Sequence, residues 1–262
     1  MGNISLKIEG KLARVILDRA EKHNAFNDQT IKELSGAFDE IEKNDNVRAV
    51  LLESTGKSFS AGGDLAWMKK TKDYTESENL NDANALADML YKLNYLSKPT
   101  VAKIQGPAFG GGVGLVACCD IAIAADTAKF CLSEVRLGLS PATISPYVIK
   151  AMGASQARRY FLTAERFDAA TAARINLVHE VCEPSQLDEK VDKILSHLMA
   201  GGPEALGIAK DLIYLTEPMV NDEILEKTAQ QIARQRVTKE GQEGLGAFFE
   251  KRPAAWTQDA HP

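Results

Sequence analysis

The chain has 262 residues, of which 45% are hydrophobic and 26% charged, and its formal net charge is −5. This composition is typical of a folded globular protein and excludes an intrinsically disordered chain. The negative charge argues against a protein that binds nucleic acid or a membrane surface through a broad cationic field, although a local group of Lys and Arg could still bind a phosphorylated ligand.

The cysteines and histidines are scattered along the chain. No two cysteines have the CxxC spacing, and the adjacent pair Cys118–Cys119 could not form a disulfide without strain. The histidines lack the spacing of a zinc site, so no metal site is predicted. The first residues lack the apolar core of a signal peptide, and no apolar run is long enough to span a bilayer. We therefore expect reduced thiols and a cytoplasmic protein.

The first part of the chain alternates strands and helices. Strands are predicted at 5–9, 12–17, 47–53, 100–105 and 120–125, and helices at 28–43, around Trp67 and over 86–96. The helix at 28–43 has its apolar residues at helical spacing, and Asn27 or Asp28 is a suitable N-cap. An acidic, polar stretch at 72–82 is expected to be mobile. The strand–helix–strand order favours parallel crossovers and an α/β core.

The pattern changes in the second part of the chain. From about residue 146 to 252 it is mostly helical, with helices predicted at 204–216, 221–236 and 240–250. Gly201-Gly202-Pro203 interrupts the pattern, and Pro203 suits the first turn of a helix. We therefore divide the chain into an α/β core over 1–195 and a helical C-terminal region over 196–262.

Two glycine-rich loops are the first candidates for a functional site. Gly62-Gly63-Asp64 and Gly110-Gly111-Gly112 each follow a predicted strand and precede a helix. Glycine lets backbone N–H groups approach a ligand, and a helix N-terminus adds a positive dipole. Two such loops could offer two donors to one oxygen, as in an oxyanion hole; the alternative is a pair of tight turns without chemistry. A dinucleotide site at 112–117 is disfavoured, because the helix there would be only about two turns long.

Charged residues supply two further candidates. Glu134 lies among apolar residues just after a predicted strand, where burial would raise its pKa and suit it to proton transfer. The alternative is a surface carboxylate paired with Arg136 or with another Arg. Lys251 and Arg252 could bind a phosphate, or could form a solvated helix end, where cations suit the dipole.

A series of stretches in a fixed order carries a resemblance to a known family: HNAFN, SFSAGGDL, KPTVAKIQGPAFGGGVGL, CDIAIAADTAKFCLSEVRLGLSP and FFEKRPAAW. Together they cover essentially the whole chain, which resembles the crotonase (enoyl-CoA hydratase/isomerase) superfamily. Within it, LSEVRLGLSPATISPYV and EGQEGLGAFFEKRPAAW are most similar to bacterial methylglutaconyl-CoA hydratases of leucine and isovalerate breakdown.

The resemblance implies an α/β, crotonase-like spiral of ββα units with a helical C-terminal trimerisation region, and trimers that pair into hexamers. It implies an acyl-CoA thioester substrate and no separate cofactor, since coenzyme A is part of the substrate. An oxyanion hole is expected at the backbone N–H groups of Gly63 and Gly111. The residues implied to contact coenzyme A are Ala25, Phe26, Ala61, Asp64, Leu65 and Lys251, the last near the phosphates and across a subunit boundary.

The sequence departs from the family at one catalytic acid. Typical hydratases carry two glutamates; Glu134 matches one, and Gly114 stands at the position of the other. We expect Glu134 to hold the water that adds to an enoyl-CoA, with methylglutaconyl-CoA as substrate and Arg136 as the cation facing its carboxylate. The space at Gly114 is expected to admit a branched or carboxylated acyl chain or an extra water, and Gly114→Glu to raise hydration of simple enoyl-CoAs.

Three alternatives remain open at this point. An enoyl-CoA isomerase would use Glu134 alone to move a proton between two carbons. Another crotonase chemistry would decarboxylate a malonyl-type thioester. The loss of one glutamate would also suit a catalytically weak acyl-CoA-binding or RNA-binding scaffold, although the acidic balance and the lack of basic blocks weigh against RNA.

Overall fold

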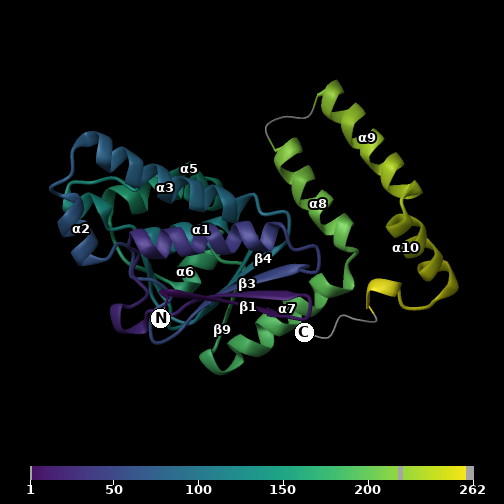
Figure 1. The fold of residues 1–262 in the computed structure, drawn as a ribbon, viewed down its shortest axis with the longest axis horizontal. Coiled ribbons are helices and arrows are strands. Elements are labelled where there is room, and N and C mark those ends of the chain that lie inside the picture. Colours follow the sequence, from purple (N-terminus) through teal and green to yellow (C-terminus); the bar gives the residue numbers. More distant parts are fainter. Residues whose placement is uncertain (1, 218–220, 258–262) are drawn as a thin grey trace.

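A six-stranded sheet forms the centre of the structure (Figure 1), a computed structural model that describes residues 2–217 and 221–257. Its strands, in spatial order, are β1 (Ile4–Glu9), β2 (Leu12–Leu17), β3 (Ala49–Ser54), β4 (Thr100–Ile104), β6 (Ile121–Ala125) and β9 (Glu180–Cys182). β1 and β2 form an antiparallel hairpin, and the other neighbouring pairs are parallel. The predicted α/β class with parallel crossovers is thus confirmed.

Helices cover both faces of this sheet. On one face pack α1 (Asp28–Glu42), α3 (Glu76–Asn94), α4 (Gly111–Cys118) and α5 (Ser145–Thr163), and on the other packs α7 (Leu187–Ala200). Side chains alternate along a strand, so Val50 and Leu52 of β3 join the first cluster, whereas Ala49 and Leu51 pack with α7. Burial on both faces explains why β3 is almost continuously apolar.

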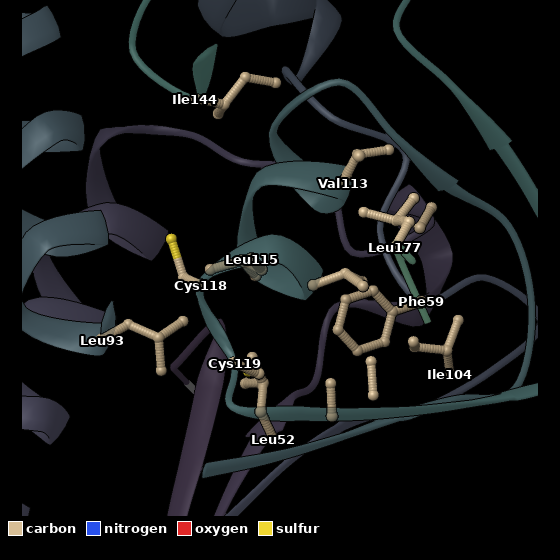
Figure 2. Packing of buried hydrophobic residues seen from close by; sticks show 14 of the residues in the cluster. Leu52, Phe59, Leu93, Ile104, Val113, Leu115, Cys118, Cys119, Ile144 and Leu177 are labelled. Carbon is tan, nitrogen blue, oxygen red and sulfur yellow. The ribbon is translucent and has the colours of Figure 1, made fainter. Parts of the chain in front are cut away.

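Helix α4 lies within the larger of the two apolar clusters. Figure 2 shows the side chains of Val113, Leu115 and Cys118 leaving this helix among buried neighbours that include Phe59 and Leu93. A helix that is apolar on all sides has to be buried on all sides, and α4 packs against α3 and α5. It has 8 residues, which agrees with the two turns expected from the sequence and not with a dinucleotide-binding crossover.

A second, three-stranded sheet consists of β5 (Ala108–Phe109), β7 (Lys129–Cys131) and β8 (Phe167–Asp168), and α6 (Ala169–Arg174) follows β8. The sequence analysis missed these strands, and β9 too, because runs of two or three residues show no alternation. Isolated bridges join Ser60 to Ala108 and Phe26 to Gly63. These short ladders hold together the loops that follow β2, β3 and β4.

Most of the stretch at 72–82, which was expected to be mobile, is helical. α2 (Leu65–Thr71) ends just before this stretch, and α3 starts within it at Glu76, with a capping box. In that box the Thr75 side chain accepts from the Glu78 N–H, and the Glu78 carboxylate accepts from the Thr75 N–H. The first turns of α3 are exposed, so their polar composition reflects a solvated helix face rather than a loop.

The last helices form an arm that projects from the core (Figure 1). They are α8 (Pro203–Thr216), α9 (Asp222–Val237) and α10 (Lys239–Glu250). The boundary predicted at 195 falls inside α7, which packs on β3, β4 and β6 and continues to Ala200; the arm therefore begins at Pro203. Its exposed apolar side chains are those of Ile213, Leu225, Ile232, Val237, Leu245, Phe248 and Phe249.

One buried guanidinium fastens both ends of this arm to the core. Arg48, just before β3, donates to the carbonyl oxygens of Met199 (2.9 Å) and Gly201 where the arm begins. It also donates to the carbonyl oxygen of Trp256 (2.8 Å), where the arm returns. A planar guanidinium carries enough fixed donors to reach all three acceptors. The arm is thus anchored at its ends while its outer surface stays open.

No helix within residues 2–217 and 221–257 is long and apolar enough to cross a membrane. The four cysteines are free and buried, as the sequence predicts. Burial raises the pKa of the Cys118 and Cys119 thiols, which makes them poor nucleophiles. In the part of the chain that the structure describes, no group of three or more His, Cys, Asp or Glu side chains is arranged to hold a metal ion.

Candidate active site

The two glycine-rich loops lie against each other. Ser60 donates from its N–H to the Pro107 carbonyl (3.1 Å) and accepts from the Phe109 N–H (2.8 Å), which aligns the two segments. A Cβ on Gly62 would lie 2.9 Å from the Phe109 carbonyl oxygen and 3.7 Å from the Gly110 Cα. Gly62 has φ +85° and Gly110 has φ +50°. Close approach and backbone conformation therefore both require glycine here.

Each loop contains a candidate oxyanion donor, a backbone N–H that makes no hydrogen bond to the described residues. Gly63 pairs with Phe26 in a parallel bridge, but the hydrogen bonds of this bridge belong to the neighbours of Gly63. The Phe26 N–H donates to the Gly62 carbonyl and the Phe26 carbonyl accepts from the Asp64 N–H, both at 2.7 Å. Gly111 is the first residue of α4, where N–H groups have no acceptor within the helix. Among the described residues, neither the Gly63 N–H nor the Gly111 N–H donates a hydrogen bond.

Two free donors in touching loops, one of them at the positive end of a helix, are what an oxyanion hole requires. The alternative, that the loops are tight turns and nothing more, accounts for their glycines. A helix start by itself leaves its first N–H groups without intrahelical acceptors, so the free N–H groups are compatible with an oxyanion hole and do not require one. The structure therefore brings together the two backbone positions singled out from the sequence, and their role as oxyanion donors stays a prediction.

The Glu134 carboxyl lies next to these loops. The turn η2 (Glu134–Leu137) follows β7 and places Glu134 Oε1 3.1 Å from where a Cβ on Gly110 would lie. Its Oε2 is buried and has no hydrogen-bond partner among the described residues. Burial raises the pKa of Glu134 above the usual range of a glutamate. The alternative of a surface pair with Arg136 is not observed, because Arg136 is exposed and Glu134 Oε2 is unpaired.

Phe26 and Asp64 support the loops from inside the protein. The Phe26 ring is buried against Gly111, where a Cβ would lie 2.7 Å from the ring. Asp64 caps α2 by accepting two N–H groups of its first turn (2.7 and 3.2 Å) and pairs with Arg19 (2.8 Å). Burial alone would raise the pKa of Asp64, but these hydrogen bonds and the ion pair lower it.

The other residues implied to contact coenzyme A are spread more widely. Ala25 is buried and Ala61 half-buried, whereas Leu65, at the start of α2, is 83% exposed. Lys251 ends α10, and Figure 1 shows α10 and α2 at opposite ends of the molecule. A single chain thus does not bring Lys251 to the glycine loops. Lys22, which the sequence analysis did not consider, is an exposed cation whose carbonyl accepts from the Ala25 N–H (3.1 Å).

The space expected at Gly114 is filled. A Cβ on Gly114 would collide with the Cγ2 methyl of Ile144, and would lie 3.0 Å from the Ile144 Cβ and 3.7 Å from Leu90 Cδ2. The expectation that Gly114 leaves room for a branched acyl chain or an extra water is therefore wrong. Gly114→Glu by itself would force Ile144 out of place, so we no longer expect that substitution alone to raise activity.

Comparison with known proteins gives a consistent result. The sequence model of a family described as Enoyl-CoA hydratase/isomerase matches residues 7–259. A crystal structure of an enoyl-CoA hydratase from Shewanella pealeana has a TM-score of 0.93 and 44% identity, covering 97% of this chain and 96% of that chain. The short-chain-enoyl-CoA hydratase of Clostridium acetobutylicum is 32% identical over 255 residues, 96% of each chain. The trans-2-decenoyl-[acyl-carrier-protein] isomerase of Streptococcus mutans is 27% identical over 256 residues, 97% of each chain.

Proposed function

Because the chain belongs to the enoyl-CoA hydratase/isomerase family, we propose that it adds water across the α,β double bond of an enoyl-CoA thioester. One observation carries the proposal. Half-buried Glu134, whose Oε2 is buried and has no hydrogen-bond partner among the described residues, lies beside two touching loops that offer free N–H groups at Gly63 and Gly111. A proton acceptor and a pair of oxyanion donors are the groups that conjugate addition of water to a thioester needs.

In the proposed reaction, the thioester oxygen accepts hydrogen bonds from the Gly63 and Gly111 N–H groups. Ionised Glu134 takes a proton from a water as the water oxygen bonds to the β-carbon, and the double-bond electrons move to the thioester oxygen as an enolate. Each donor is worth about 10²–10³ in rate, because its hydrogen bond strengthens as this charge develops. The enolate then takes the proton from Glu134 at its α-carbon. The carboxyl ends as it began, so a single acid–base group completes the cycle.

Activity should be lost on the acid side as Glu134 is protonated. The group must be ionised to accept a proton from water, and its pKa is raised by burial. We expect kcat/KM to fall tenfold per pH unit below a midpoint that lies above the usual pKa of a glutamate. The measurement is a pH profile of kcat/KM with crotonyl-CoA. A profile that stays flat down to the ordinary pKa of a glutamate would contradict this assignment.

We further propose methylglutaconyl-CoA as the substrate and a homotrimer, or a pair of trimers, as the assembly. The substrate rests on the two sequence stretches most similar to methylglutaconyl-CoA hydratases, with exposed Arg136 near Glu134 as the cation for the distal carboxylate. The assembly rests on the apolar side chains exposed along α8, α9 and α10. A second copy would cover these side chains, and only a second copy could bring Lys251 to the coenzyme A phosphates.

A second candidate function is enoyl-CoA isomerisation. It is favoured by the single carboxyl of this site, since moving a proton from one carbon to another needs one acid–base group, and by the similarity to a Streptococcus mutans isomerase. The same oxyanion donors would stabilise the same enolate. The two functions differ in whether water bonds to the β-carbon.

Mass spectrometry of the products of an acyl-CoA panel tests the proposal. The panel contains crotonyl-CoA, methylglutaconyl-CoA, a 3-enoyl-CoA and a malonyl-type thioester. We expect the first two to gain the mass of one water. A shifted double bond without added water would show an isomerase, and released carbon dioxide a decarboxylase. Binding of all four thioesters without turnover would leave a scaffold that binds acyl-CoA.

A further inference from the structure

We propose that Ile144 is a specificity-determining residue that limits this site to one acid–base group, because its side chain occupies the place that a side chain at position 114 would need. This inference rests on the proposed function, since it concerns the number of carboxyls that can act on the acyl group. Ile144 is the N-cap of α5 and lies 30 positions from Gly114 in the sequence.

Two glycines at the start of α4 define the place in question. Gly110 is the N-cap of the helix, with φ +50° and ψ −118°, and Gly114 lies in its first turn. A Cβ on Gly110 would point at Glu134 Oε1, at 3.1 Å. A Cβ on Gly114 would point at Ile144, with Leu90 as the next neighbour. A side chain at position 114 would therefore meet Ile144 before it could extend any further.

Ile144 has little freedom to give way. Its side chain is 2% exposed, and Leu90 of α3, which bounds the same space, is fully buried. Its carbonyl accepts the Val148 N–H (3.1 Å) in the first turn of α5, so its backbone is held by that helix. Figure 2 places Ile144 at the edge of the apolar cluster around α4. In such tight packing there is no free space for an added methyl group, so it displaces its neighbours and lowers stability.

Two chemical consequences follow from this packing. The Ile144 side chain occupies the space that a second carboxylate would need. Glu134 therefore has no second ionisable group beside it with which to titrate as a coupled pair. The Ile144 side chain also excludes the water that a second carboxylate would hold. The proton that Glu134 removes from water is then the one available to the α-carbon, as the single-carboxyl cycle requires.

Thermal unfolding of alanine variants tests the packing without using substrate. We expect Gly114→Ala to lower Tm by roughly 5 °C in the wild-type background, and by much less in an Ile144→Ala background, where the opposing methyl is gone. Ile144→Val is the matched control, because valine keeps the Cγ2 methyl and should not relieve the loss. Gly36→Ala, at a position with no atom within 4 Å of its Cβ, should add independently to Ile144→Ala. Equal losses from Gly114→Ala in both backgrounds would overturn the proposal.

Activity of glutamate variants tests the chemical claim. Gly114→Glu/Ile144→Ala should hydrate crotonyl-CoA at least tenfold faster than Ile144→Ala, and its kcat/KM should show a second ionisation in the pH profile. A folded double variant with the rate and single ionisation of Ile144→Ala would overturn the proposal. If that variant does not fold, the thermal unfolding of the alanine variants is the test of the proposal. If wild type hydrates no thioester, the proposed function fails, while the unfolding series still reports on Ile144.

Discussion

Glu134→Gln should lower kcat for hydration by about 10²–10⁴, the range expected for loss of a general acid–base group. Glutamine has the shape of the glutamate but cannot accept a proton from water. KM should change only a few-fold, since the thioester is held by the Gly63 and Gly111 backbones, which the substitution does not touch. Steady-state kinetics with crotonyl-CoA and methylglutaconyl-CoA measure both constants. Activity within threefold of wild type on both substrates would show that another group moves the proton.

The same variant should be at least as stable as the wild type at neutral pH. Burial raises the pKa of Glu134, so the native state binds its proton more tightly than the unfolded state does. Ionisation of Glu134 therefore lowers the free energy of unfolding as the pH rises from the pKa of the unfolded state to the higher pKa of the native state. Glutamine carries no charge and removes this cost above that window. Glu183→Gln, at an exposed position after β9, is the control and should change neither kcat nor stability.

Gly110→Ala should damage both folding and catalysis. Gly110 has φ +50° and ψ −118°, a conformation that is strained for any residue with a Cβ and costs about 1–3 kcal/mol. The added methyl would also lie 3.1 Å from Glu134 Oε1. Any relief of this strain shifts the start of α4, and with it the Gly111 N–H and the carboxyl. We expect the free energy of unfolding to fall by about 1–3 kcal/mol and kcat/KM by at least about tenfold, since misplacing one oxyanion donor costs up to about 10³.

The matched glycine for this experiment is Gly36, in the middle of α1. A Cβ there meets no atom within 4 Å, and alanine is favoured over glycine inside a helix by about 0.5–1 kcal/mol. Gly36→Ala should therefore raise the free energy of unfolding and leave kcat/KM unchanged. Denaturant unfolding and steady-state kinetics on the three proteins separate the two effects. A Gly110→Ala protein with wild-type kcat/KM would show that the Gly111 N–H does not act in the reaction.

Local patterns predicted the elements and residues whose signals lie close together in the chain. The amphipathic spacing after Asn27 predicted α1 within one residue of its observed ends, 28–42. The two glycine loops and Glu134 were also readable, because their residue types and their positions after strands are local features. The start of α3 at Glu76 was missed, although its local signal, the Thr75–Glu78 capping box, lies within the stretch at 72–82 that was expected to be mobile.

Other features depend on residues far apart in the sequence. β5, β7 and β8 have two or three residues each, so pairing across the fold, rather than their own pattern, makes them strands. The Glu134 carboxyl had an obvious local partner in Arg136, and only the packing around η2 shows that the pair does not form. The end of α7 at Ala200 likewise follows from its contacts with the sheet.

The α/β class, the family resemblance, the two glycine loops and the candidate acid Glu134 could all be predicted from the sequence. These rest on periodicity, glycine positions and residue types, which are properties of neighbouring residues. Three features are visible only in the folded chain: the loops touch, Glu134 Oε2 is buried without a partner among the described residues, and Ile144 fills the space at Gly114. Each of these depends on the distance between segments far apart in the chain, and that distance is set by the packing of the whole core.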